Sequence, residues 1–237
     1  MQKIRSNLFA LIWTLWTACF GLVLVVVIAL GSPPKLVRAS TRVWARGVLW
    51  FLKTVVGIHY EIKGRENIPS EPCLIVSNHQ SAWETIAYLL IFPELAIITK
   101  IELLRIPIFG GFLKRSPMIP IDRDSGTKAL RKMIDDGHAA IASGRSVLIF
   151  PEGTRQAPGM PIQFKRGVEL LYGKLNSQML PVAMNSGEFW FPGNQTKRAG
   201  TISVFILPSI EAGMAAQDAI RLAERQVQTS LDKLRGA

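Results

Sequence analysis

Residues 73–84 of this 237-residue chain read Cys-Leu-Ile-Val-Ser-Asn-His-Gln-Ser-Ala-Trp-Glu. The short apolar run 73–77 is typical of a buried strand, and the polar residues after it predict the start of a helix. Asn78 is expected to cap that helix. His79 precedes Glu84 by five positions, and a carboxylate on one imidazole nitrogen raises the basicity of the other. The stretch predicts a general base with its orienting acid, although alone it also fits a surface histidine beside an incidental acid.

The chain after residue 58 alternates short β-rich runs with longer helical runs. We expect strands at 73–77, 95–99, 117–121, 147–150, 179–184 and 201–207, and helices at 85–92, 126–143, 167–175 and 214–234. Such alternation predicts an α/β fold with a central mostly parallel or mixed sheet flanked by helices.

Residues 8–30 are apolar apart from Thr, Cys, Gly and two Trp. As a helix they span about 34 Å, enough for the hydrocarbon core of a bilayer. A signal peptide is the alternative, but its apolar region is usually shorter, and the residues after this run make a poor cleavage site. The run therefore predicts a membrane helix that ends at Pro33 and Pro34.

A basic stripe marks the next segment. Lys35, Arg38, Arg42, Arg46 and Lys53 fall on one face of a helix, and apolar residues that include two Trp cover much of the rest. This composition predicts a helix in the lipid interface with its cations toward phosphate headgroups. An ordinary solvated face packed on the domain is the alternative.

The distribution of positive charge predicts topology. Only Lys3 and Arg5 precede the apolar run, so the positive-inside rule places the remainder on the cytoplasmic side of the inner membrane. If the first helix inserts only partly, both helices form one monotopic anchor. We expect residues 1–57 to be a membrane-anchoring helix pair and residues 58–237 the domain that carries the chemistry.

The net charge of +11 indicates an anionic partner. Nucleic acid is disfavoured, because the cations follow an amphipathic helix and scattered strand ends rather than an aromatic-interleaved patch. No metal-ligand spacing is present: the histidines are His59, His79 and His138, and the first and last are expected to be structural or solvated. Two cysteines, Cys19 and Cys73, imply no disulfide framework.

Two further segments place charge at predicted strand ends. Residues 150–155, Phe-Pro-Glu-Gly-Thr-Arg, follow a buried-strand pattern and turn at a glycine. Arg155 and the backbone N–H groups of that turn suit an anion, and Glu152 can brace the turn or Arg155. A turn with a solvated arginine is the alternative for this stretch alone. Lys100 and Arg123 also lie at strand ends, where α/β sheets gather ligands. The apolar, Gly-rich stretch 106–113 fits either a wall for a lipid chain or ordinary core.

Together these stretches resemble the glycerolipid acyltransferase family, in particular the 1-acylglycerol-3-phosphate acyltransferases. The acid of that family is usually Asp where this chain has Glu84, and a Gly usual near the start of its second block corresponds to Pro117 here. The matching stretches, in order, are 78–84, 121–123, 150–155, 164–167 and 180–182.

The resemblance implies transfer of a fatty acyl group from acyl-CoA or acyl-carrier protein to the sn-2 hydroxyl of lysophosphatidic acid, a step of phospholipid biosynthesis. His79 would be the base and Glu84 its orienter, with no metal and no cofactor. Another lysolipid acceptor, such as lyso-ornithine lipid, is the nearest alternative, and a non-catalytic anionic-lipid-binding membrane protein is the other. The residues implied to bind the acceptor phosphate and glycerol are Lys100, Arg123, Glu152, Gly153, Thr154 and Arg155.

Overall fold

The computed structural model describes residues 1–92, 94–193 and 196–235, with Arg123 described by its backbone alone. The helices are α1 Gln2–Ala29, α2 Pro34–Phe51, α3 Trp83–Ile91, α4 Phe109–Arg115, α5 Gly126–Ala142, α6 Arg166–Leu175 and α7 Ala216–Arg235. The strands are β1 Ile58–Lys63, β2 Leu74–Ser77, β3 Leu95–Lys100, β4 Ile119–Ile121, β5 Ser146–Ile149, β6 Met179–Met184 and β7 Gly200–Ile206.

The strands form one seven-stranded sheet in the order β1-β7-β6-β2-β5-β3-β4. All neighbours pair in parallel except β6 and β7, which are antiparallel. The predicted mixed sheet with flanking helices is therefore confirmed. Because β2 lies between β5 and β6, the carboxyl ends of these three strands meet at one edge, where α/β proteins bind ligands.

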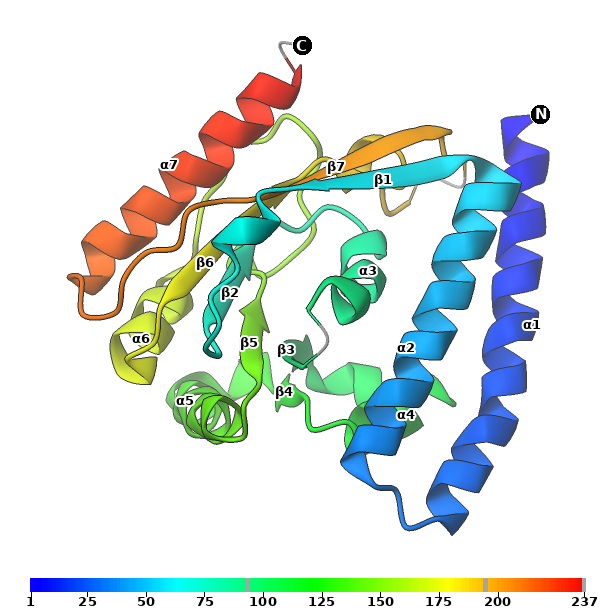
Figure 1. Ribbon diagram of the computed structural model, residues 1–237, viewed down its shortest axis with the longest axis horizontal. Helices are drawn as coiled ribbons and strands as arrows, with labels where there is room; N and C mark the ends of the chain where they lie inside the picture. Colours follow the sequence, from blue (N-terminus) through cyan, green and yellow to red (C-terminus); the bar gives the residue numbers. More distant parts are fainter. Residues whose placement is uncertain (93, 194–195, 236–237) are drawn as a thin grey trace.

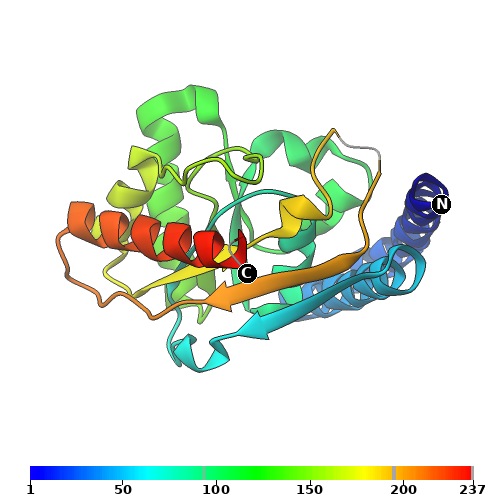
Figure 2. The ribbon, with the colours of Figure 1, turned by 90° about the horizontal axis from the view of Figure 1, so that it is seen from above.

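The sheet separates two layers of helices (Figure 1), and side-chain alternation along each strand decides which layer each residue packs against. In β2, Ile75 belongs to the core shared with α1, α2 and α3, whereas Leu74 and Val76 belong to the core under α5 and α6. Figures 1 and 2 place α7 and the pair α1–α2 at opposite sides of the molecule.

Helix α1 has two different faces, although its sequence from Leu8 onward is almost entirely apolar. One face repeats at alternating steps of three and four, as in a heptad seam, and packs against the protein; its members are Ser6, Phe9, Trp13, Trp16, Phe20, Val23 and Val27. The opposite face is aliphatic and exposed, with Leu8, Leu11, Leu15, Leu22, Val25 and Val26. By length and composition alone, α1 could cross a bilayer, with a mean hydropathy of 2.5 over its best window.

Helices α1 and α2 lock together through their tryptophans. The Trp16 indole N–H donates to the Trp44 carbonyl oxygen at 3.1 Å, and the Trp44 indole N–H donates to Thr17 Oγ1 at 3.1 Å. A Cβ at Gly47 would lie 2.5 Å from the Trp16 ring, so only glycine leaves room for it. The two helices are therefore one packed unit.

Two elements differ from the sequence-based expectation. Strand β1 was not expected, because it is an edge strand paired only with β7 and most of its residues are exposed. Helix α4 was not expected either, because Gly110 and Gly111 disfavour a helix. The backbone of Gly110 lies against the Leu104 carbonyl, and a Cβ on Gly111 would meet Leu24 of α1 at 2.5 Å. Strand β1 begins at Ile58, but the division into two domains stays a prediction.

Candidate active site

Asn78 ties the end of β2 to the neighbouring strand β6. Its amide N–H donates to the Met184 carbonyl at 2.9 Å, and its amide oxygen accepts from the Met184 N–H at 3.0 Å. The expected helix cap is therefore wrong: α3 begins at Trp83, whose N–H bonds the Ser81 hydroxyl. The two-way bond satisfies a buried amide and fixes the backbone where His79 leaves the sheet.

The Glu84 carboxylate accepts hydrogen bonds from the segment that precedes it. Its Oε1 lies 2.8 Å from His79 Nδ1 and accepts from the backbone N–H groups of Gln80 and Ser81 at 2.8 and 2.6 Å. Its side chain is fully buried. Because a carboxylate only accepts, the contact places the ring proton on Nδ1 and leaves Nε2 as the basic nitrogen. The expected contact between His79 and Glu84 is present.

Aromatic rings hold the plane of the imidazole. The His79 ring stacks on Phe150, the last residue before the turn after β5, with centroids 4.1 Å apart and planes 17° apart. Phe150 in turn stacks on Tyr88, whose hydroxyl bonds Ser77 Oγ at 2.8 Å. The His79 side chain remains 14% exposed, so a substrate can reach its edge. No hydrogen bond within the described residues occupies Nε2.

The turn after β5 is bonded to the backbone of His79 at both ends. The His79 N–H donates to Glu152 Oε2 at 2.7 Å, and the His79 carbonyl accepts from the Gln156 N–H at 2.8 Å. Gly153 has φ +74°, a conformation that L side chains rarely adopt, and the Lys165 side chain lies along it. The segment that carries His79 and the turn at residues 150–155 are therefore bonded to each other.

The Glu152 carboxyl is buried on the turn after β5. It is 3% exposed, and burial raises its pKa to about 7, against the bond from the His79 N–H, which lowers it; the nearby charge of Glu84 raises it further. Its Oε1 has no hydrogen-bond partner among the described residues. Glu152 therefore links the turn to the backbone of His79, and its raised pKa lies near neutral pH.

The remaining predicted site residues are held less firmly. Thr154 and Arg155 are exposed on the same turn, beside the His79 backbone contacts, and Lys100 is exposed at the end of β3. Arg123 begins a short turn after β4, and its side chain lies outside the described part of the chain. Their roles stay predictions.

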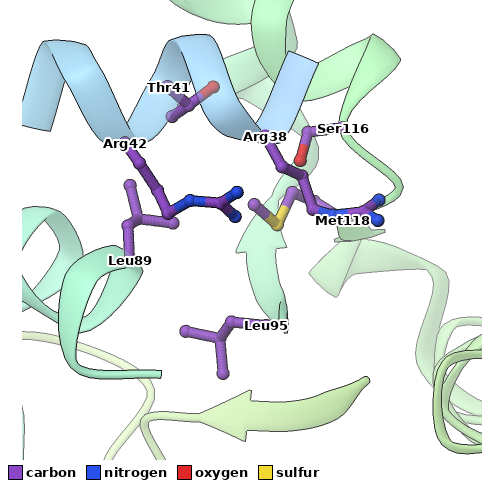
Figure 3. A pocket seen from close by; sticks show the side chains of 7 residues that line it. All are labelled: Arg38, Thr41, Arg42, Leu89, Leu95, Ser116 and Met118. Carbon is purple, nitrogen blue, oxygen red and sulfur yellow. The ribbon is translucent and has the colours of Figure 1, made fainter. Parts of the chain in front are cut away.

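Four of the five cations of the basic stripe form two pairs with different surroundings. Arg38 and Arg42 contact Glu94 at 3.0 and 3.6 Å, and Figure 3 shows both side chains leaving α2 toward the small pocket that they line. For Arg38 and Arg42 the structure therefore shows packing on the rest of the protein, which was the alternative to contact with lipid headgroups. Arg46 and Lys53 instead face an open cavity of about 450 Å³ between α2, β1 and α3, whose other lining residues are Leu49, Trp50, Ile58, His59, Tyr60 and Leu90.

Part of the apolar stretch 106–113 packs against the helix pair, whereas Ile106 is exposed. Phe112 is 8% exposed and lies against Phe20 of α1, while Phe109 contacts Trp44 of α2. Phe112 is therefore core, and a wall for a lipid chain stays a prediction for the rest of this stretch.

Two expectations concern metals and cysteines. Among residues 1–92, 94–193 and 196–235, no group of three His, Cys, Asp or Glu side chains could hold a metal ion. Cys19 is exposed and Cys73 is buried, and neither forms a disulfide. Burial raises the pKa of the Cys73 thiol to about 11, which makes it unreactive.

Ser186 joins the site from a distant part of the chain. Its hydroxyl donates to Glu84 Oε2 at 2.8 Å, and its side chain is fully buried. Nothing in the sequence marks it, because a serine after a strand is common. The only available signal is its place just beyond 179–184, a strand that could be expected to lie next to the one carrying His79.

Three comparisons with known proteins all find acyltransferases. The acyltransferase family model matches residues 59–185. A 1-acyl-sn-glycerol-3-phosphate acyltransferase of Pseudomonas aeruginosa is 36% identical over 212 residues, covering 90% of this chain and 82% of the relative. The human 1-acyl-sn-glycerol-3-phosphate acyltransferase beta is 29% identical, and the match covers 74% of this chain and 66% of that protein.

The fold has a counterpart of known structure. The crystal structure of the 1-acyl-sn-glycerophosphate acyltransferase PlsC from Thermotoga maritima matches with a TM-score of 0.83 at 22% identity, covering 100% of this chain and 99% of that one. At this identity the likeness concerns the fold. The family match over more than half of the chain, together with the bacterial relative, shows that this protein belongs to the acyltransferase family.

Proposed function

We propose that this protein transfers a fatty acyl group from a thioester to the sn-2 hydroxyl of lysophosphatidic acid, which yields phosphatidic acid. The observation that carries the proposal is the His79–Glu84 pair, 2.8 Å apart at the end of β2. The named activity of the relatives from Pseudomonas and human supports the choice of substrate.

The pair supports direct transfer. His79 Nε2 takes the proton of the acceptor hydroxyl while its oxygen attacks the thioester carbonyl. The C–S bond then breaks, and the leaving thiolate takes the proton back from the imidazolium. Glu84 stabilises the imidazolium through Nδ1. General-base catalysis of this kind supplies roughly 10²- to 10⁴-fold, and positioning of both substrates must supply much of the rest.

The acceptor phosphate is proposed to bind the turn after β5. Arg155 lies between Glu152 and Gln156, the two residues that bond the His79 backbone. A guanidinium there can bind phosphate in a bidentate manner close to the base. Lys165, over Gly153, adds a second cation. Lys100 and Arg123 stay proposed contributors at the neighbouring strand ends.

The helix pair is proposed to hold the domain at the cytoplasmic face of the inner membrane. Support comes from the exposed aliphatic face of α1 and from the cations and aromatic side chains around the 450 Å³ cavity, where Trp50 is 60% exposed. A lysolipid acceptor partitions into the same interface. Spanning and monotopic insertion both agree with α1.

The donor is proposed to be acyl-CoA or acyl-carrier protein, with no metal and no other cofactor. In the test, the purified protein is kept in detergent and given labelled acyl-CoA or labelled acyl-carrier protein together with one of a panel of lysolipids. Lysophosphatidic acid is expected to be acylated fastest. If only lyso-ornithine lipid is acylated, that lipid is the acceptor and the proposal of lysophosphatidic acid is wrong. If the protein binds anionic vesicles but transfers no acyl group, it is a lipid-binding protein and not an enzyme.

A further inference from the structure

Glu84, the carboxylate that orients His79 in the proposed reaction, has a second partner on a separate loop. Glu84 Oε1 serves His79 and two backbone N–H groups, whereas Oε2 accepts a single side-chain hydrogen bond among the described residues, from the Ser186 hydroxyl at 2.8 Å. Both side chains are fully buried. A buried carboxylate is costly unless its oxygens are hydrogen-bonded, so this hydroxyl matters to the state of the acid.

The loop that carries Ser186 is fastened to the segment between His79 and Glu84. The Gly187 N–H donates to Gln80 Oε1 at 3.1 Å. A Cβ on Gly187 would come within 2.8 Å of the Gln80 Cβ, so the two backbones are in close contact. The Ser186 hydroxyl is thus held against Glu84 by its own backbone and not by a flexible side chain.

The far end of the same loop is fastened to α1. Trp190 packs edge-on against Phe9 and Trp13 at 5.8 and 5.4 Å, and the Lys197 ammonium lies 4.9 Å from the Trp190 ring. The Lys197 N–H also donates to Ser6 Oγ at 2.8 Å. The protein-facing side of the helix proposed to enter the membrane therefore also supports the loop that reaches the catalytic acid.

We infer that Ser186 is a positioning residue for acyl transfer: its hydroxyl fixes the Glu84 carboxylate so that Oε1 stays on His79 Nδ1. This rests on the proposed function. With the hydroxyl removed, Oε2 has no side-chain donor and the carboxylate can rotate away from the imidazole. The titratable groups facing Glu84 are His79 from the loop after β2, Tyr88 from α3 and Glu152 from the turn after β5.

The test compares Ser186→Ala and Ser186→Cys with a matched control. Cysteine nearly keeps the volume but is only a weak donor, so kcat is expected to fall in the order Ser, Cys, Ala, reaching roughly tenfold for alanine, as for a lost hydrogen bond to a charged group. KM for lysophosphatidic acid and for the donor should stay unchanged. The acid limb of the pH–rate profile should move to lower pH, because a carboxylate that has rotated away from Nδ1 stabilises the imidazolium less.

Ser203→Ala is the control, since the Ser203 hydroxyl also serves a carboxylate, Glu61, at 2.9 Å but lies away from Glu84. It should keep the kcat and pH profile of the unaltered protein. Unaltered kcat in Ser186→Ala, or equal losses in Ser186→Ala and Ser203→Ala with unmoved pH limbs, would overturn the inference while the proposed function stands. Absence of transfer by the unaltered protein would instead overturn the proposed function, and the inference with it.

Discussion

The proposed base and the proposed phosphate-binding cations lie on neighbouring loops but are held very differently. The His79–Glu84 pair is fixed by backbone N–H groups, a stacked phenylalanine and a serine from another loop. Arg155 and Lys100 are exposed. A base must meet its proton with precise geometry, whereas a phosphate tolerates several cation positions. The contrast predicts that changes at the pair act on kcat and changes at the cations act on KM.

The largest effect is expected from His79→Ala. Without the imidazole no group takes the hydroxyl proton, so kcat for acylation of lysophosphatidic acid should fall by roughly 10²- to 10⁴-fold. Association with anionic vesicles should be unchanged. The matched control is His138→Ala on the exposed face of α5, which should keep full turnover. Substantial turnover in His79→Ala would end the assignment of the base.

Glu152→Gln tests whether the brace between the two loops carries a pH-dependent cost. In the folded chain the Glu152 pKa is about 7, against an ordinary value of 4.5. The folded state then binds the proton more tightly, so this group lowers the free energy of unfolding as pH rises from 4.5 to about 7, by roughly 3 kcal/mol. Glutamine keeps an oxygen for the His79 N–H without titrating.

Denaturant unfolding in detergent at pH 5 and pH 8 measures this cost. Relative to the unaltered protein, Glu152→Gln should gain stability at pH 8 and little at pH 5. The difference between the two proteins isolates Glu152 from the other titrating groups. An equal gain at both pH values would show that the carboxyl does not exchange its proton near neutrality.

Arg155→Ala tests the proposed phosphate-binding cations instead of the His79–Glu84 pair. Losing a charged contact to the acceptor phosphate should raise KM for lysophosphatidic acid by roughly tenfold with kcat nearly kept, because the base is untouched. KM for the acyl donor should not change. Arg131→Ala, on the exposed surface of α5, is the matched control. A loss confined to kcat would mean that Arg155 supports the base and not the phosphate.

The smallest effect is expected from Glu94→Gln, which removes the carboxylate that pairs with Arg38 and Arg42 on α2. Because the Glu94 side chain is 47% exposed, the free energy of unfolding should fall by no more than about 1 kcal/mol, with kcat and KM unchanged. Thermal unfolding and steady-state kinetics measure both. A large loss of activity would show that Arg38 and Arg42 contribute to the site.

The sequence allowed most of the sheet to be predicted, since buried strands such as β2 and β6 are continuous apolar runs with turn residues on both sides. The pairing of His79 with Glu84 could be predicted because both lie within one short segment. Ser186 could not, because its approach depends on the order of the strands, which places β6 beside β2. That order results from packing between distant parts of the chain and has no local signature.

The role of Asn78 was predicted wrongly for a related reason. An asparagine before a helix suits a cap, but the Met184 backbone offered both a donor and an acceptor in a buried place. The two faces of α1, in contrast, could have been found, since Phe9, Trp13, Trp16 and Phe20 recur at steps of four, three and four within the apolar run.

Those two faces make α1 a part that cannot be exchanged freely. A generic membrane helix of equal hydropathy, grafted in place of residues 2–29, would still be apolar enough to enter lipid. It would lack the Trp16 ring that packs on Gly47 and the two aromatic side chains that contact Trp190. Among relatives we expect the aliphatic face to drift with the thickness and composition of the host membrane. The aromatic positions should change only together with the residues that they contact, such as Trp190, so the two faces of one helix should vary independently of each other.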